Sequence, residues 1–337
     1  MDINYYEDLL TNKEALFNKK QKGQYYTPNS VTNLLTRLLI QGIEDYKDFK
    51  VYDPCCGVGN LLLLCARSLK LQEVYGQDIE KESVDVATEI LSKEFKTDIQ
   101  LGDVLCDPKH KDLEFELIIA NPPYSVKWVG NDDPTLINDY RFAPAGVLAP
   151  KSKADFAFVL HILHYLSPKG RASVVCFPGI FYRAGAEQKI RQYLVDNNYV
   201  ETVISLAPNL FFGTSVPVTI LVLAKNKKNT DIQFIDASGE EFFKKEKDNN
   251  VMYDEHIDKI IDMFGSKEDV QYVAKTVKVE RVQENDYNLS VSSYVEAKDT
   301  REVIDITKLN AEIKETVTKI DRLRTDIDSI IGEIESF

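Results

Sequence analysis

The sequence predicts an α/β fold built on a mostly parallel sheet of seven strands, with an antiparallel last strand. One observation is that four short apolar runs each end at a polar residue, namely Asp53, Asp78, Asp103 and Asn121. Another is that apolar patterns of helical period separate these runs, as in consecutive strand–helix units. Because the carboxyl ends of parallel strands lie at one edge of a sheet, we expect these residues to share a ligand-binding rim.

Composition describes a soluble protein with a real core, since 44% of the 337 residues are hydrophobic and 28% are charged. No apolar run approaches the ~18 residues of a membrane span, and residues 1–8 are no signal peptide. The five cysteines show no C-x-x-C spacing, so reduced thiols, a cytoplasmic location and no membrane association are expected. A net charge of −13 leaves two interpretations: the substrate is not nucleic acid, or a basic partner supplies the phosphate contacts.

The first predicted strand, residues 50–52, leads into Asp53-Pro54-Cys55-Cys56-Gly57-Val58-Gly59-Asn60 and then a helix. Strand, glycine-rich turn and helix is the setting in which backbone amides approach a ligand at a helix N-terminus. Leu62 occupies the third glycine position of the dinucleotide fingerprint, and no Walker lysine follows, so diphosphate ligands and nucleotide hydrolysis are disfavoured. A strand-end aspartate suits a ligand that carries an ammonium group.

The second and third predicted strands end at Asp78 and Asp103. Asp78 follows Gly57 by about 20 residues, which places it to accept hydrogen bonds from ribose hydroxyls. Capping the next helix is a second, compatible role for Asp78.

The fourth predicted strand, residues 117–120, ends in Asn121-Pro122-Pro123-Tyr124, which we interpret as the reaction centre. Two prolines stiffen the chain and remove two backbone donors, so the carbonyls of Asn121 and Pro122 are free to accept hydrogen bonds. If the Asn121 side chain and the Pro122 carbonyl accept both N–H bonds of an aromatic amine, the nitrogen lone pair becomes available. Attack on a sulfonium methyl then needs only positioning and electrostatics. Tyr124 offers a ring on which an extruded base can lie.

Other chemistries have less support. A C5-pyrimidine methyltransferase needs a cysteine nucleophile, and none follows the two prolines. His161 and His164 share a helix face, but no cysteine or carboxylate stands beside them at metal-ligand spacing, so no metal site is predicted.

The remaining elements complete the predicted fold. Residues 125–153 form a loop long enough to be a lid or disordered, and contain the only tryptophan, Trp128. The last two strands have no helix between them, which predicts an antiparallel hairpin. The elements after the loop are a helix at 155–166, a strand at 172–177, a helix at 187–197, and strands at 200–206 and 218–224.

A heptad pattern begins after Asp299, with an a/d seam interrupted once by Thr316. A helix of this length with no further chain to cover it requires a partner helix. The seam consists of Ile313, Thr316, Ile320, Leu323, Ile327, Ile330, Ile334 and Phe337. The predicted parts of the chain are an N-terminal leader (1–22), the main α/β domain (23–226), a mixed α/β extension without recognisable chemistry (227–298) and the C-terminal heptad helix (299–337). Within the extension, a strand at 232–235 and a helix near 253–264 are expected.

Three motifs in order resemble those of N6-adenine DNA methyltransferases of the gamma arrangement. They are Gln24-Tyr25-Tyr26-Thr27-Pro28, Asp53-Pro54-x-x-Gly57-x-Gly59 and Asn121-Pro122-Pro123-Tyr124. Within that group the chain is most similar to modification subunits of type I restriction–modification systems, over roughly residues 23–337. Family members usually carry a sizeable helical domain before the first motif, whereas about 22 residues precede it here. The later matching patterns are Arg183 to Glu187, Phe211 to Thr214 with Pro217, and Tyr287 to Ser290 with Ser293 and Tyr294.

The resemblance implies a Rossmann-like S-adenosylmethionine-dependent methyltransferase fold and methyl transfer to the N6 amine of a flipped adenine in double-stranded DNA. Asp78 would bind the cofactor ribose and Asp103 its adenine amino group. Asn121, Pro122, Pro123 and Tyr124 would hold the target adenine, with Phe211 or Phe212 as a second stacking face. The implied cofactor-binding residues are Gln24, Tyr25, Tyr26, Thr27, Pro28, Asp53, Gly57, Gly59, Asn60, Asp78, Asp103 and Val104.

The resemblance also implies how an acidic chain can act on DNA, because such subunits pair with a specificity subunit that reads DNA. The C-terminal helix is expected to dock on that subunit, and a restriction subunit is a further expected partner. Two alternatives stay open: a protein glutamine methyltransferase of the release-factor type, which also uses Asn-Pro-Pro-Tyr, and a catalytically silent assembly subunit. The Tyr-Thr-Pro motif argues against the first, and the intact glycine and Asn121 motifs argue against the second.

Overall fold

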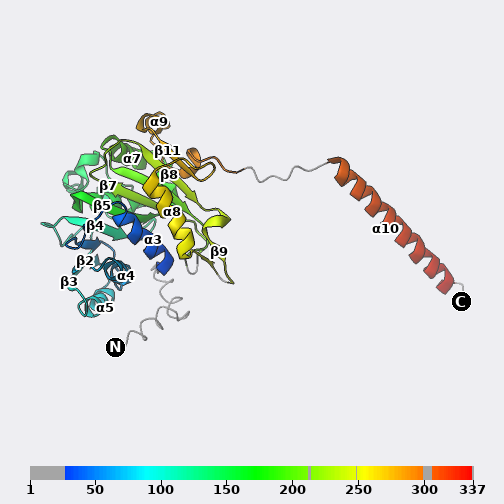
Figure 1. Ribbon diagram of the computed structural model, residues 1–337, viewed down its shortest axis with the longest axis horizontal. Helices are drawn as coiled ribbons and strands as arrows, with labels where there is room; N and C mark the ends of the chain where they lie inside the picture. The colour runs from blue at the N-terminus through cyan, green and yellow to red at the C-terminus, as the bar shows by residue number, and fades with distance from the viewer. Residues whose placement is uncertain (1–26, 212–213, 248, 299–305, 336–337) are drawn as a thin grey trace. The chain divides into compact units, whose positions relative to one another are not determined.

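The chain divides between Glu296 and Ala297 into two compact units. The first unit contains a central sheet covered by helices, and the second contains one long helix (Figure 1). The computed structural model describes residues 27–211, 214–247, 249–298 and 306–335.

A nine-stranded sheet has the strand order β11-β8-β6-β7-β5-β4-β1-β2-β3. β7 is antiparallel to both of its neighbours, β11 is antiparallel to β8, and all other neighbouring strands are parallel. The mostly parallel sheet and the antiparallel pairing of β6 with β7 are therefore as predicted. The strands are β1 (Val51–Asp53), β2 (Glu73–Asp78), β3 (Lys96–Leu101), β4 (Phe115–Ala120), β5 (Leu166–Cys176), β6 (Val200–Leu206), β7 (Thr219–Ala224), β8 (Ile232–Ala237) and β11 (Ala274–Val277).

The predicted number of seven strands is wrong, because β8 and β11 extend the sheet beyond β6. Both strands lie in residues 227–298, which the sequence assigns to a separate extension. β8 contains the strand predicted at 232–235, but its pairing with β6 in the main sheet was not predicted. β11 has four residues, Ala274 to Val277, so its alternation is too short to identify a strand from sequence. Pairing with β8 creates it: Ala274 lies opposite Ile235, and Val277 lies opposite Ile232.

Helices cover both faces of the sheet (Figure 1), which gives the first unit two apolar cores. β4 separates them, since Leu117 and Ile119 point into one core and Ile118 and Ala120 into the other. Both sets are fully buried, which explains the uninterrupted apolar run of this strand. The core of Leu117 contains α3 (Asn29–Ile40), α4 (Asn60–Leu69), α5 (Lys81–Leu91) and α8 (Asp254–Ser266), and the core of Ile118 contains α6 (Asp155–Tyr165), α7 (Ala186–Asp196) and α9 (Val279–Glu284).

The loop between β4 and α6 is ordered by its own apolar side chains. Trp128 and Phe142 are buried, and their rings meet edge to face with centroids 5.5 Å apart. The loop contains the short 3-10 helices η1 (Gly130–Asp132), η2 (Leu136–Asn138) and η3 (Ala143–Ala145).

The second unit contains helix α10 (Ile306–Glu335), 30 residues long. The predicted C-terminal helix is thus present, although 299–305 and Phe337 lie outside the described residues. Its large apolar side chains are 45–70% exposed, from Ile306 to Ile334. Across the described part of the chain, no helix is both long and apolar enough to cross a membrane.

Candidate active site

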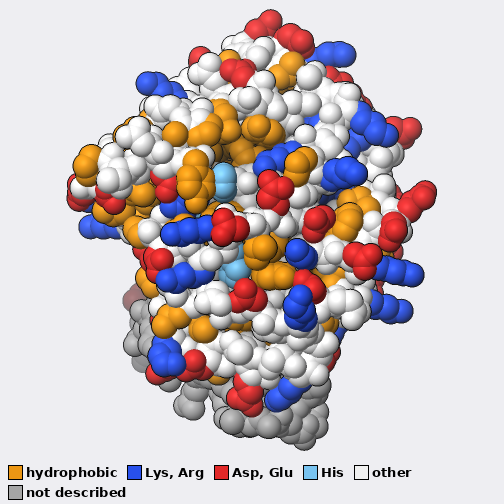
Figure 2. Space-filling model, turned by 90° about the vertical axis from the view of Figure 1, so that its left-hand side faces the viewer, with side chains coloured by type: hydrophobic (Ala, Val, Ile, Leu, Met, Phe, Trp, Pro, Cys, Tyr) orange, Lys and Arg blue, Asp and Glu red, His pale blue; other side chains and the backbone are white. Residues whose placement is uncertain are grey.

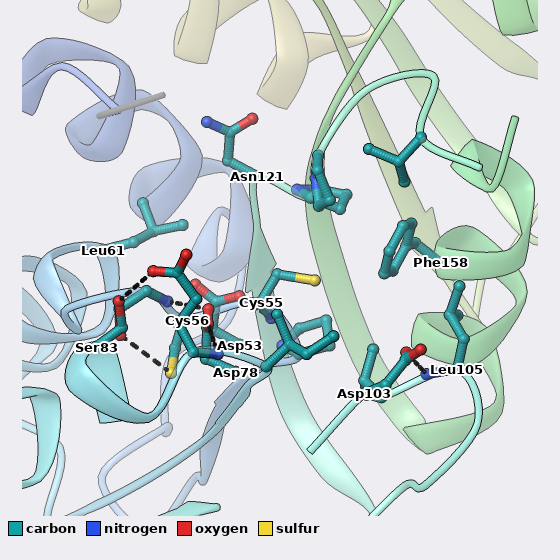
Figure 3. Close-up of a pocket in the computed structure, with 18 of the residues that line it drawn as sticks. Asp53, Cys55, Cys56, Leu61, Asp78, Ser83, Asp103, Leu105, Asn121 and Phe158 are labelled. Carbon is teal, nitrogen blue, oxygen red and sulfur yellow. Dashed lines mark hydrogen bonds between the residues drawn. The ribbon is translucent and has the colours of Figure 1, made fainter. Parts of the chain in front are cut away.

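A cavity of about 420 Å³ lies at the edge of the sheet where β1, β2, β3 and β4 end. Its size is typical of a small-molecule site. Figure 3 shows Asp53, Asp78, Asp103 and Asn121 on its walls, each projecting from a different strand end. Most of the predicted site residues line it: Thr27, Asp53, Gly57, Asn60, Asp78, Asp103, Val104, Asn121, Pro122, Pro123 and Tyr124.

Two described residues of the predicted cofactor set, Pro28 and Gly59, do not line the cavity. Pro28 directly precedes α3. Gly59 begins α4 with a φ of 84°, and a Cβ there would lie 3.0 Å from the Leu91 side chain and 3.1 Å from Ala87. Gly59 therefore lets α4 pack closely on α5, and its contact with a cofactor stays a prediction. The predicted residues that lie outside the described part of the chain are Gln24, Tyr25, Tyr26 and Phe212.

Two carboxyls organise the glycine-rich turn. Asp53 is 1% exposed and accepts a hydrogen bond from the N–H of Cys55 at 2.9 Å. Asp78 accepts from the N–H of Gly57 at 2.8 Å and from that of Glu80 at 2.9 Å. Gly57 has a φ of 53°, a conformation in which glycine is unstrained. Burial raises the pKa of Asp53 to about 8, with a further contribution from the Asp78 charge, and burial also raises the pKa of Asp78.

A buried carboxyl beside a half-buried one favours a cationic ligand, because a positive charge next to them stabilises the ionised form. The ammonium-bearing ligand that the strand-end aspartate predicts would supply such a charge, and its binding here stays a prediction.

The side-chain amide of Asn121 is held by two motifs. Its Nδ2 donates to Thr27 Oγ1 at 2.9 Å, which joins residues 94 positions apart in the sequence. The Tyr124 hydroxyl donates to Asn121 Oδ1 at 2.6 Å. Because Thr27 engages the NH₂ group, the amide oxygen is left as the acceptor, and a carboxamide oxygen accepts two hydrogen bonds. The amide can therefore accept from an incoming amine while Thr27 fixes its orientation.

Asp155, at the start of α6, holds the turn after Tyr124. Both of its carboxylate oxygens lie 3.1 Å from the backbone N–H of Ser125, which has a φ of 51°. A non-glycine residue in this conformation is uncommon and needs support from its surroundings. The sequence gives no signal for this role, since Asp155 resembles any acidic residue in a first helical turn.

One end of the cavity, beside Asp103, Leu105 and Phe158, is apolar (Figure 3). Val104, Val126 and Trp128 also line the cavity, and Asp103 accepts a hydrogen bond from the N–H of Leu105 at 3.0 Å. Aromatic and branched side chains around a few polar groups suit a flat heteroaromatic ring. Trp128 was detectable from sequence as the only tryptophan, close after Tyr124. Phe158 was not, because it lies within a continuous apolar helix.

Phe211 is 2% exposed, belongs to the apolar core beside α8 and does not line the cavity. Its predicted stacking on a target base stays a prediction. His161 is buried in contact with Tyr52 and Arg141. In the part of the chain that the structure describes, no cluster of three or more His, Cys, Asp or Glu side chains could hold a metal ion.

Known proteins match this chain over most of its length. The type I restriction enzyme MpnII methylase subunit of Mycoplasma pneumoniae is 41% identical over 94% of this chain and 61% of its own length. The MjaVII methylase subunit of Methanocaldococcus jannaschii is 33% identical over 94% of this chain and 56% of its own. The chain thus spans about three fifths of the length of these relatives.

A solved structure agrees with the sequence matches. The type I restriction–modification system methyltransferase subunit from Streptococcus thermophilus superposes with a TM-score of 0.76 and 37% identity, covering 81% of this chain and 59% of that one. The family model for N-6 DNA methylases matches residues 3–303. The chain therefore belongs to the N-6 DNA methylase family.

Proposed function

We propose that this chain transfers a methyl group from S-adenosylmethionine to the N6 amine of an adenine extruded from double-stranded DNA. We further propose that it acts as the modification subunit of a type I restriction–modification complex. Family membership supports the reaction class, and the relatives supply the type of complex.

The residues of the cavity fit S-adenosylmethionine, which supplies its methyl group as a sulfonium. Asp53 would pair with the ammonium group and Asp78 with the ribose hydroxyls. Asn60 begins α4, and its buried Nδ2 has no hydrogen-bond partner among the described residues, so it is available to a carboxylate at this helix N-terminus. Asp103 would accept from the adenine amino group, between the apolar walls of Trp128 and Phe158.

Asn121 and Pro122 would activate the target amine. The Asn121 side-chain oxygen and the Pro122 carbonyl accept its two N–H bonds, which draws the nitrogen toward tetrahedral geometry and exposes the lone pair. Both acceptors belong to a stiff chain segment, so little reorganisation is needed when charge develops on the nitrogen. Tyr124 would stack on the base. The observation that carries the proposal is the Thr27–Asn121 hydrogen bond, which orients the acceptor inside the cofactor cavity.

Mapping N6-methyladenine tests the proposed activity. We expect it at a defined site in DNA from cells that produce this chain with a specificity-type partner subunit, and not in cells with the Asn121→Ala variant. The proposal would be wrong if purified complex transferred labelled methyl groups to a release-factor glutamine and not to DNA. Calorimetry that detects no binding of S-adenosylmethionine would instead support a silent assembly subunit.

Cofactor affinity should depend on the protonation of Asp53. Burial raises its pKa to about 8, so at neutral pH the Asp53 carboxyl is mostly protonated. It must lose this proton before it can pair with the ammonium group of the cofactor. We expect the Kd for S-adenosylmethionine to fall as pH rises from about 6 to about 7.5, by up to about tenfold per pH unit. Calorimetric titration at several pH values measures this.

Asp53→Asn is the control for this titration, because the amide keeps the shape but cannot ionise. Its Kd should be higher and independent of pH over the same range, and a wild-type Kd without pH dependence would contradict the assignment.

Without cofactor, the folding stability of the wild type should decrease as pH rises, whereas its cofactor affinity increases. A carboxyl whose pKa rises on folding contributes stability that is lost as pH rises toward about 8. The melting temperature of Asp53→Asn relative to wild type should therefore increase from pH ~5 to pH ~8.

A partner subunit is expected to bring the DNA. The net charge of −13 opposes binding to phosphates by this chain alone, and the face in Figure 2 shows acidic and basic side chains interspersed rather than a continuous basic surface. We propose that α10 docks on helices of a specificity subunit through its exposed apolar side chains. A restriction subunit would be a further partner for cleavage.

A further inference from the structure

Arg141 is a buried arginine, 3% exposed, in the loop between β4 and α6. Its side chain donates to the carbonyls of Val104 at 2.8 Å and Leu105 at 2.7 Å. It also donates to both carboxylate oxygens of Asp139, at 2.9 and 2.7 Å, and lies 3.2 Å from His161 Nδ1. A guanidinium has five N–H donors, and these contacts give each of them a partner.

The two carbonyls belong to the turn that lines the apolar end of the cavity. Leu105 is fixed at both of its peptide groups, because its N–H donates to Asp103 and its carbonyl accepts from Arg141. Gln77, also buried, holds the flanking residues by donating to the carbonyls of Gly102 at 3.1 Å and Asp107 at 2.8 Å. Two buried side chains therefore hold this turn from outside the cavity.

The contact with His161 depends on the histidine being neutral. Burial lowers the pKa of His161 well below its usual value, with the Arg141 charge as the next cause. Its neutral Nδ1 can accept from Arg141 while Nε2–H donates to the Tyr52 hydroxyl at 3.2 Å. Only the planar, forked guanidinium serves all of these acceptors at once. A lysine ammonium is a single point donor and would leave at least one buried carbonyl unpaired.

We propose that Arg141 is a positioning residue for the adenine end of the cofactor. It holds the turn of Asp103, Val104 and Leu105 in the conformation that faces the adenine, and it ties this turn to the loop that follows the catalytic motif. The inference rests on the proposed function, since it assumes that the cavity binds S-adenosylmethionine.

Arg171 provides a matched control. It donates to three backbone carbonyls, those of Leu38 and Leu39 at 3.2 Å and Gln41 at 2.8 Å, and to the Glu201 carboxylate at 2.9 Å. It lies on β5 opposite Leu117, at the end of the β4–β5 pair away from the cavity. A change of Arg171 to lysine thus removes a similar set of hydrogen bonds without touching the cavity.

The test compares calorimetric Kd values for S-adenosylhomocysteine and for adenosine, with thermal unfolding measured alongside. We expect Arg141→Lys to weaken both ligands by about tenfold, because binding must then restore the conformation of the turn against the cost of one unpaired buried carbonyl. An equal loss for adenosine locates the effect at the nucleoside end. Arg171→Lys should lower the melting temperature by a similar amount while leaving both Kd values unchanged.

Unchanged Kd values for folded Arg141→Lys would overturn the inference, as would an equal loss of affinity in Arg171→Lys. If Arg141→Lys does not fold, Asp139→Asn carries the same test, because it leaves Arg141 in place and removes the charge that orients it. Weaker binding by Asp139→Asn supports the inference, and unchanged binding overturns it. If wild type itself does not bind S-adenosylhomocysteine, the proposed function fails and the inference fails with it.

Discussion

Asn121→Ala is expected to lower kcat for N6-adenine methylation by about 10²- to 10³-fold, the usual cost of removing one preorganised hydrogen-bonding group from a reaction centre. The alanine removes the side-chain oxygen and leaves the Pro122 carbonyl as the only acceptor for the amine. Asp53 and Asp78 are untouched, so the Kd for S-adenosylmethionine should stay within about twofold of wild type. Single-turnover methylation at saturating cofactor, together with calorimetry, separates the two effects.

Tyr124→Phe is the matched control. It removes the hydroxyl that donates to Asn121 Oδ1 at 2.6 Å but keeps the aromatic ring and the amide. If the amide oxygen is the amine acceptor, this variant should retain most of its activity. Loss of the Tyr124 hydroxyl frees a lone pair on Asn121 Oδ1 for the target amine and leaves the acceptor itself in place. N6-methyladenine formation at a normal rate by Asn121→Ala would show that the amide is not the acceptor.

The parts of the fold that the sequence predicts correctly are those with local causes. β4 is recognisable because it is buried on both faces and ends at two prolines. α4 is recognisable because a glycine-rich turn precedes an apolar helix. β11 has no such cause, since four residues become a strand only by pairing with β8, and pairing partners distant in sequence leave no local pattern. β8 contains the strand predicted at 232–235, but no local pattern shows that it pairs with β6, so the sheet has nine strands instead of the seven expected.

The residues of the candidate site also divide into those with a local sequence signal and those that depend on contacts distant in sequence. Asp53, Asp78, Asp103 and Asn121 could be identified because each follows an apolar run. The family resemblance added Thr27, but its hydrogen bond to Asn121 spans 94 positions and no spacing rule predicts it. Asp155 and Arg141 act on backbone groups of segments remote in sequence, so nothing near them in the chain distinguishes them from ordinary surface charges.

Deletion of α10 is expected to abolish assembly with a specificity-type subunit. Its apolar side chains are 45–70% exposed, and burying one such side chain contributes roughly 1.5–3 kcal/mol. Replacing three seam residues with serine should therefore weaken the complex by at least about 10³-fold. Co-purification and sedimentation of the two subunits measure this. The three residues are Ile320, Leu323 and Ile327.

A matched triple variant on the opposite face of the same helix separates docking from a loss of helix structure. Heptad geometry puts these positions away from the seam, so changing them to serine should leave the complex intact. They are Thr318, Arg322 and Thr325. Unchanged assembly of the seam variant or of the deletion would refute docking through α10. Because α10 belongs to a separate unit from the cavity, the deletion should still bind S-adenosylmethionine with wild-type affinity while methylation of DNA falls. That combination would show that the first unit carries the chemistry and that α10 is needed only to bring it the base.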